Sequence, residues 1–327
     1  MNKIPIKEYN VISNGGWGKV ISMEDAKKEH IKNIAAWEKA TKEYYEKDRP
    51  LRILVIHGSG RADIYGSSDD QPNQGSVSSA FLNRCMKVVD KIDKTIEVEE
   101  VNLTKLNINP CWNCVAVTSG LCGAPCDCHP VDDMHQLYPK LIRNDIHFIS
   151  TGVNQSAMSS RLKLMVDRMI SLDGGFFHDE DQFGTKDQAF ITKMKLLAES
   201  GQIAYDQRLY GRVGGYFISS KDQNQPRVPT NAMGENSDKD IEKLGYARLV
   251  AYSLKDGMIA YGYFHDPEYW AVAAADYDID YMYDMETMEN NKKAHEKGER
   301  VIRNAIKLAK QLKKDLPEFV PDRINRT

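Results

Sequence analysis

Residues 146–168 decide how this chain folds: Ile146-His147-Phe148-Ile149-Ser150 runs into Thr151-Gly152-Val153-Asn154-Gln155-Ser156-Ala157-Met158-Ser159-Ser160-Arg161-Leu162-Lys163-Leu164-Met165-Val166-Asp167-Arg168. The first five residues predict a buried parallel strand. Leu162, Met165, Val166 and Met169 recur at spacings of three and four, which predicts an amphipathic helix. The polar loop between them offers backbone N–H groups at the carboxyl end of a strand, where open α/β sheets bind ligands. An ordinary connection without a ligand is the alternative.

Four other segments predict strands of the same sheet. They span residues 51–57, 96–101, 212–220 and 258–264. Segments with the apolar spacing of helices separate them, and a terminal helix follows the last one. This alternation predicts an α/β fold with a doubly wound, five-stranded parallel sheet.

The first fifty residues differ from the rest. Residues 1–50 lie outside the strand and helix alternation, and we expect them to form an N-terminal extension. Within it, Ser22 and Asp25 resemble a capping box that opens a helix over residues 22–46. A helix so rich in charge outside the main domain is typical of a packing arm or a dimer contact.

Residues 51–315 are expected to form the main domain, and residues 316–327 a C-terminal tail. Two long insertions interrupt the domain. Residues 172–210 are polar and predict an insertion near the ligand edge. Residues 265–286 mix tyrosines with acidic residues, which is typical of a flap or a subunit interface.

The composition excludes several classes of protein. With 327 residues, 41% of them hydrophobic, the chain can bury a large core. A net charge of −3 provides no basic surface for nucleic acid, and no apolar run approaches the roughly 20 residues of a membrane span. The first eight residues lack the apolar core of a signal peptide. We therefore expect a cytoplasmic protein that binds neither nucleic acid nor membranes.

Serines and one arginine surround the connection after residues 51–57. Gly58-Ser59-Gly60-Arg61 ends the strand, and Ser76, Ser78 and Ser79 stand where the next helix begins. Free N–H groups at a helix start, hydroxyls and a guanidinium favour a phosphate dianion. The glycine spacing fits neither a dinucleotide loop nor a P-loop. A serine-rich cap without a lysine or an acidic magnesium ligand favours a monophosphate bound without metal. Serines that merely cap the helix are the alternative.

Five of the six cysteines fall in one segment: Cys111, Cys114, Cys122, Cys126 and Cys128. Scattered core cysteines do not cluster in this way, and such thiolates can hold an iron–sulfur cluster or a zinc ion. Their spacing matches no ferredoxin or zinc ribbon, so a loop braced by packed thiols is the alternative. The sixth, Cys85, shares an apolar helix face with Val77, Phe81, Val88 and Ile92 and is expected in the core.

Three blocks, in this order, resemble the NAD(P)H-dependent FMN reductases of the flavodoxin-like superfamily, which include iron–sulfur flavoproteins. The first is the strand that enters Gly58-Ser59-Gly60-Arg61, with the serines of residues 76–79. The second runs from Pro110-Cys111 to Asp132-Asp133-Met134. The third runs from Thr151-Gly152-Val153 through Leu162-Lys163 to Asp167-Arg168. The resemblance covers residues 51–312 and implies a flavodoxin-like fold.

The resemblance also implies where FMN lies. The phosphate would be held by Ser59, Arg61, Ser76, Ser78 and Ser79, whereas Ser219 and Ser220 would lie near the isoalloxazine ring. The isoalloxazine ring would be surrounded by Gly152, Val153, Asn154, Gln155, Ser156, Ala157 and Met158. Two features depart from the family: Gly152 and Asn154 replace its usual Pro-Tyr pair, and Val117 stands where the iron–sulfur members have a third cysteine.

These features predict an oxidoreductase that passes hydride from NADH or NADPH to FMN, and then electrons to a quinone, a free flavin or another small-molecule acceptor. The cofactor carries this chemistry and the protein positions it, so no catalytic residue is named. One alternative is a flavin electron carrier, with or without a cluster, that has no nicotinamide activity. Another is a zinc-braced regulatory module without flavin. We expect a homodimer or homotetramer.

Overall fold

The computed structural model describes residues 22–46, 48–59, 76–113, 125–126, 128–155, 157–173, 209–220, 245–274 and 285–315. Four candidate site residues lie outside this part of the chain: Arg61, Cys114, Cys122 and Ser156. Most of the insertion expected over residues 172–210 lies outside it as well.

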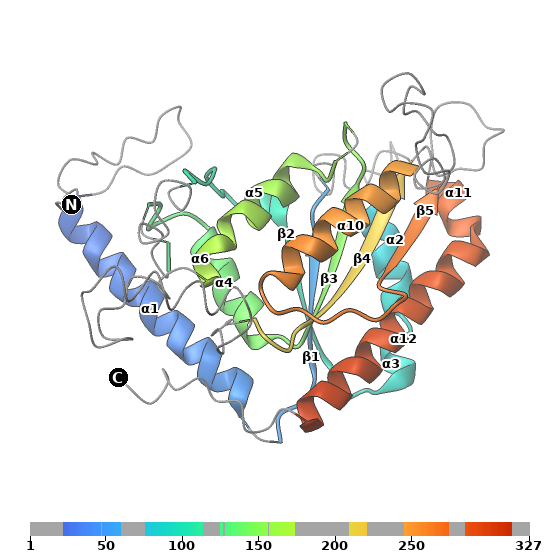
Figure 1. Cartoon of the computed structure of the whole chain (residues 1–327), viewed down its shortest axis with the longest axis horizontal. Coiled ribbons are helices and arrows are strands. Elements are labelled where there is room, and N and C mark those ends of the chain that lie inside the picture. The colour runs from blue at the N-terminus through green and yellow to red at the C-terminus, as the bar shows by residue number, and fades with distance from the viewer. Residues whose placement is uncertain are drawn as a thin grey trace, which may run out of the picture.

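Five parallel strands form one sheet in the order β2-β1-β3-β4-β5 (Figure 1). The strands are β1 (Arg52–His57), β2 (Glu97–Asn102), β3 (Ile146–Gly152), β4 (Val213–Ser220) and β5 (Trp270–Ala274). Their neighbours pair in parallel throughout, for example from Ile146 beside Val213 to Gly152 beside Ser219. The predicted doubly wound, five-stranded parallel sheet is confirmed.

The predicted position of the fifth strand is wrong. Residues 258–264 contain the end of helix α10 (Gly245–Ile259) and a turn in which Gly262 has a φ of 87°. Phe264 makes only an isolated bridge to Val213. The strand itself begins at Trp270, inside the stretch expected to be a flap. Its alanines have weak strand propensity, and burial beside β4 decides its conformation instead.

Alternation along the strands separates two hydrophobic cores. On β1, Leu54 and Ile56 pack with one set of helices, and Ile53 and Val55 pack with the other. Helices cover both faces of the sheet (Figure 1). The first core contains residues of α1 (Met23–Tyr45), α4 (Met134–Arg143), α5 (Ser160–Arg168), α6 (Ile170–Asp173) and α10. The second contains residues of α2 (Val77–Met86), α3 (Val89–Ile92), α11 (Met285–Asn290) and α12 (Lys292–Asp315).

Helix α1, in the N-terminal extension, packs along α4 (Figure 1). Its start agrees with the predicted capping box, because the Ser22 side chain accepts a hydrogen bond from the Asp25 N–H. Trp37 is buried, and its ring meets that of Tyr138 edge-on at 5.0 Å. The helix therefore contributes side chains to the core of the main domain.

The helix expected over residues 76–92 is divided. Helix α2 ends at Met86, and α3 begins at Val89. Cys85 lies in the core as predicted, and burial raises the pKa of its thiol to about 12. A thiol in such surroundings is a packing group rather than a nucleophile.

The remaining short element is a 3₁₀ helix, η2 (Leu103–Lys105), directly after β2. Within the described residues, no helix combines the length and apolar composition needed to cross a bilayer.

Candidate functional site at the carboxyl edge of the sheet

The connections after β1 and β3 leave the sheet on opposite faces. Helix α2 follows β1 and packs in one core, whereas α5 follows β3 and packs in the other. Since β1 and β3 are neighbours, their carboxyl ends form the topological switch point of the sheet. Open α/β sheets bind ligands at this point.

Serine hydroxyls surround the first turn of α2. The Ser76 Oγ accepts a hydrogen bond from the Ser79 N–H at 3.3 Å and lies 3.3 Å from the Ser78 Oγ. Ser76 and Ser78 are buried, while Ser79 is half-buried. Ser76 therefore caps the helix, as the simpler hypothesis holds, and Ser78 and Ser79 lie in its first turn. They also place several hydroxyls beside the N–H groups that a helix start leaves unpaired.

Gly58 allows the chain after β1 to pass close to β3 and α5. Its N–H donates to the carbonyl of Ser150 at 2.8 Å, and its own carbonyl accepts from the Ser159 hydroxyl. A Cβ at position 58 would lie 2.9 Å from the Ser150 carbonyl oxygen and 3.0 Å from the Leu162 Cβ. This crowding explains why glycine stands here. It also brings Ser59, which is buried, to the switch point.

The loop after β3 is held by backbone hydrogen bonds. The Val153 N–H donates to the Ser219 carbonyl at 2.9 Å. Asn154 and Ala157 exchange two backbone hydrogen bonds, and Gln155 between them has a φ of 48°. The side chains of Asn154, Gln155 and Ala157 are exposed, whereas Met158 is buried in the first core. The tight turn thus presents polar, exposed residues at the edge of the sheet.

The end of β4 adjoins this turn. Gly152 pairs with Ser219, and the Ser219 Oγ lies 3.5 Å from the position that a Cβ on Gly152 would take. Ser219 is half-buried and Ser220 is buried. The two predicted serines at the end of β4 therefore lie next to the predicted residues of the turn after β3.

Sequence reasoning missed the polar residues that end β1 and β3. His57 is the last residue of β1, and Ser150 and Thr151 lie near the end of β3. The Thr151 Oγ1 accepts from the Ser159 N–H at 3.1 Å, and Ser159 caps α5. The sequence did contain a usable pattern, since polar residues end two otherwise apolar strands. Their importance depends on the two strands being neighbours, which the structure shows.

The cysteine segment is anchored by the acidic pair that follows it. The Asp132 carboxylate accepts from the Asn109 N–H at 3.0 Å and forms a buried ion pair with Arg168 on α5. Asp133 accepts from the Asn107 N–H at 2.7 Å. Both carboxylates also accept hydrogen bonds from groups at the start of α4, so the pair ties the start of the segment to α4 as well as to α5.

Three cysteines of this segment lie in the described part of the chain. Cys126 is buried, while Cys111 and Cys128 are half-buried. The Asn113 N–H donates to the Cys111 Sγ at 3.3 Å. No group of three His, Cys, Asp or Glu side chains in the described residues is arranged to hold a metal ion. Cys114 and Cys122 lie outside that part of the chain.

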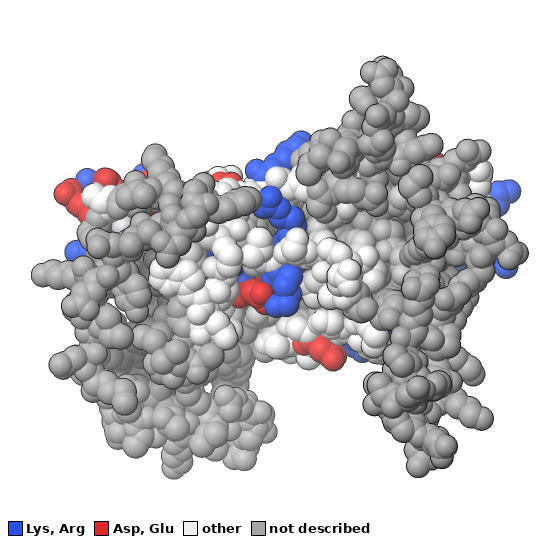
Figure 2. All heavy atoms as spheres, turned by 90° about the horizontal axis from the view of Figure 1, so that it is seen from above, with Lys and Arg blue, Asp and Glu red and all other residues white. Residues whose placement is uncertain are grey.

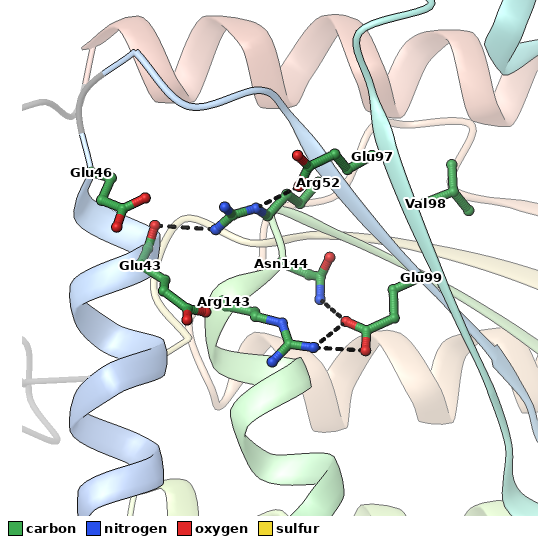
Figure 3. Close-up of a pocket in the computed structure, with 8 residues that line it drawn as sticks. All are labelled: Glu43, Glu46, Arg52, Glu97, Val98, Glu99, Arg143 and Asn144. Atoms are coloured by element: carbon green, nitrogen blue, oxygen red, sulfur yellow. Dashed lines mark hydrogen bonds and ion pairs between the residues drawn. The ribbon is translucent and has the colours of Figure 1, made fainter.

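The amino edge of the sheet has a different character. A cavity of about 420 Å³ lies there (Figure 3), lined by Glu43, Glu46, Arg52, Glu97, Val98, Glu99, Arg143 and Asn144. Arg52 pairs with Glu97 at 2.9 Å, and Arg143 pairs with Glu99 at 2.7 Å. Both guanidinium groups are thus engaged with carboxylates of β2. By contrast, the described surface at the carboxyl edge is mostly uncharged (Figure 2).

A family model for NADPH-dependent FMN reductases matches residues 51–217, about half of the chain. Comparison with curated proteins gives no match. Among solved structures, RosB with the bound intermediate 8-demethyl-8-formylriboflavin-5'-phosphate is 15% identical, with a TM-score of 0.50 over 81% of each chain. An FMN-dependent NADH-azoreductase from Bacillus anthracis, in complex with FMN, is 12% identical, with a TM-score of 0.41 over 79% of this chain and 99% of that one.

The match spans β1 to β4 and therefore contains the switch point and every candidate residue except Ser219 and Ser220. The chain belongs to the NADPH-dependent FMN reductase family and is a flavin-dependent oxidoreductase.

Proposed function

We propose that this chain binds FMN at the switch point and uses it to pass electrons from NADH or NADPH to a small-molecule acceptor. One observation carries the proposal. Hydroxyls from a helix and a strand meet there, since the Ser79 Oγ on α2 lies 3.4 Å from the Ser150 Oγ on β3. Such a neutral, donor-rich cradle at a helix start suits a phosphate monoester.

The residues present fit the phosphate of FMN. Ser59, Ser76, Ser78 and Ser79 supply hydroxyl donors, and the first turn of α2 adds backbone N–H groups. The close approach at Gly58 leaves room for no side chain between this loop and β3. Arg61, which lies outside the described residues, would add a charge-assisted hydrogen bond to the phosphate.

The ring would lie against the turn after β3, near Ser219 and Ser220. The backbone bonds from Val153 to Ser219 and between Asn154 and Ala157 fix that turn. FMN, when bound, supplies the transfer of hydride and electrons. The chain's own contribution is to position the ring and leave one side accessible to nicotinamide and acceptor. No side chain is assigned a proton-transfer role.

The test is reduction under anaerobic conditions. Protein loaded with FMN should lose its flavin absorbance when mixed with NADH or NADPH, and should recover it when a quinone is added. Reduction by one nicotinamide and not the other would identify the donor. If neither nicotinamide reduces the flavin but a low-potential protein donor does, the electron-carrier alternative replaces this proposal.

Metal binding by the cysteine segment is a separate hypothesis, because two of its five cysteines, Cys114 and Cys122, lie outside the described residues. If four thiolates from Cys111, Cys114, Cys122 and either Cys126 or Cys128 hold an iron–sulfur cluster or zinc, anaerobically purified protein will contain that metal. Cys111→Ser with Cys114→Ser should remove it and leave FMN bound. Free reaction of all six thiols and less than about 0.2 metal atoms per chain would instead indicate a packed structural loop.

We also propose a homodimer or homotetramer. Residues 265–286 were expected at a flap or a subunit interface, and the structure places residues 270–274 of this stretch in strand β5 of the sheet. Light scattering of the full chain, with and without FMN, tests it. A monomer at micromolar concentration would contradict it.

A further inference from the structure

A line of four polar side chains crosses the sheet beneath the start of α2. The Glu100 Oε1 lies 2.8 Å from the His57 Nε2, and the His57 Nδ1 lies 3.1 Å from the Ser150 Oγ. The Ser150 Oγ in turn lies 3.4 Å from the Ser79 Oγ. The line therefore runs from β2 through β1 and β3 to the helix whose start would hold the phosphate.

Strand alternation explains why these side chains meet. On β1, His57 has the same parity as Ile53 and Val55, which pack in the core that contains α2. On β3, Ser150 follows Phe148 of the same core at the same spacing. His57 and Ser150 also occupy paired positions in the sheet. All four residues thus lie on the face that α2 covers.

The four side chains of the line differ in their exposure to solvent. His57 and Ser150 are buried, whereas the Glu100 side chain is 58% exposed. The two middle residues are therefore shielded from water, whereas Glu100 at one end is exposed and Ser79 at the other is half-buried. The charged group that faces the His57 ring from β2 is Glu100, while β3 and α2 face the line with the hydroxyls of Ser150 and Ser79.

The protonation state of His57 decides which way the hydroxyls point. A neutral ring with its proton on Nε2, next to the carboxylate, accepts at Nδ1 and turns the Ser150 proton toward itself. Ser150 then accepts from Ser79, whose lone pairs face the phosphate. A protonated ring donates to Ser150 instead, so Ser150 donates to Ser79 and the Ser79 proton is free to bind an anion.

We infer that Glu100, His57, Ser150 and Ser79 form a relay that couples FMN binding to one proton on His57. This inference rests on the proposed function, since it concerns the phosphate of the same cofactor. A phosphate dianion favours the protonated relay, because every hydroxyl then donates toward it and the imidazolium adds a positive charge close by. The carboxylate of Glu100 stabilises the same state. His57 is a positioning residue, which acts on the phosphate through two serines.

The experiment compares FMN with riboflavin, which lacks the phosphate, by fluorescence titration between about pH 6 and pH 8. The ratio of the riboflavin Kd to the FMN Kd should fall about tenfold as the pH rises, the difference between a charge-assisted and a neutral hydrogen bond. The phosphate of FMN itself titrates near pH 6. This titration is the same for the wild type and the variants, so a difference between them reports the contribution of His57.

His57→Asn keeps a neutral donor near Ser150 and removes the titrating ring, so its ratio should be about tenfold lower at pH 6 and should vary with pH only through the titration of the phosphate. Glu100→Gln should shift the pH dependence to lower pH, and its exposed position should preserve folding. Glu97→Gln is the matched control, because Glu97 is also 58% exposed on β2 but pairs with Arg52 at the other edge. It should behave as the wild type.

A second readout follows the proton directly. The ¹⁵N shifts of the His57 ring should report an imidazolium in the FMN complex at a pH where the protein without FMN has a neutral ring. A neutral ring in the complex throughout, or a His57→Asn defect of the same size at every pH, would overturn the relay. If FMN and riboflavin bound equally well, the phosphate placement in the proposed function would fail, and the relay with it. A phosphate preference without pH dependence would remove the relay alone.

Discussion

The two edges of the sheet use polar side chains in opposite ways. At the amino edge, Arg49 makes two hydrogen bonds of 2.6 Å to the Asp145 carboxylate, and both side chains are almost fully buried. At the carboxyl edge, serine hydroxyls approach one another only to 3.3–3.4 Å. Charges at the first edge are neutralised within the chain. Hydroxyls at the second retain capacity to bind a ligand.

The N-terminal extension belongs to the amino edge. The Arg49 Nε donates to the Tyr44 carbonyl at 2.7 Å, and the Arg212 guanidinium lies 3.4 Å from the centre of the Tyr44 ring. Arg212 is buried at the start of β4. The end of α1 is therefore clamped to the strands by two arginines. The difference between the edges suggests that one is built for stability and the other for binding, and this division can be tested.

The largest expected effect is on stability at the amino edge. Asp145→Ala would leave the buried Arg49 charge without its partner, which should lower the free energy of unfolding by about 3–5 kcal/mol. Denaturant unfolding measures it. Arg49→Met with Asp145→Leu removes both charges and should recover most of the loss. A loss below about 1 kcal/mol in Asp145→Ala would show that the ion pair does not hold this edge.

The next effect separates capping from binding at the carboxyl edge. Ser76 and Ser22 are both N-cap serines, and each accepts a hydrogen bond from a backbone N–H three residues on. Either serine changed to alanine should cost about 0.5–2 kcal/mol of stability. Only Ser76→Ala should also weaken FMN binding, by about 1.5–3 kcal/mol or roughly 10- to 100-fold. Equal FMN affinity in the two variants would leave Ser76 as a cap and nothing more.

A buried histidine, His265, should make the free energy of unfolding sensitive to acid. Burial lowers the pKa of His265, which lies 2.7 Å from the Tyr216 hydroxyl, to about 4, and nearby Lys255 adds to the shift. The folded state thus binds this proton less readily than the unfolded state, whose imidazole titrates near 6.5. The stability that depends on a neutral His265 is therefore fully present above about pH 6.5 and is lost as the pH falls toward 4.

The measurement is the free energy of unfolding as a function of pH, for wild type and His265→Gln. Between about pH 6.5 and pH 4.5, the free energy of unfolding of the wild type should fall more steeply than that of the variant, by on the order of 1 kcal/mol per pH unit. Identical slopes would mean that His265 is charged in the folded protein or accessible to water.

The smallest effect is expected at the exposed rim of the amino edge. Glu97→Gln breaks the pair with Arg52, but the Glu97 side chain is 58% exposed, so the loss should stay below about 1 kcal/mol. Thermal unfolding at low and high salt is the appropriate measurement, and the difference from wild type should shrink with salt. A loss as large as that of Asp145→Ala would remove the distinction between rim and buried pairs.

The sequence by itself determined most of the fold and predicted where the candidate site lies. Apolar runs and helical spacing predicted four of the five strands to within one or two residues, because buried segments carry their periodicity in the sequence. The serines at the start of α2 and the polar loop after β3 were found in the same way. Both stand where a strand ends and a helix begins, and that local pattern needs no knowledge of distant neighbours.

Only the tertiary structure decided which distant residues meet. The alanine-rich β5 is a strand because β4 and α12 bury it, a cause that no window of sequence contains. Asp132 binds Arg168 across 36 residues, and His57 meets Ser150 across 93. Polar contacts of this kind depend on strand order and register, which set neighbours by geometry rather than by distance along the chain.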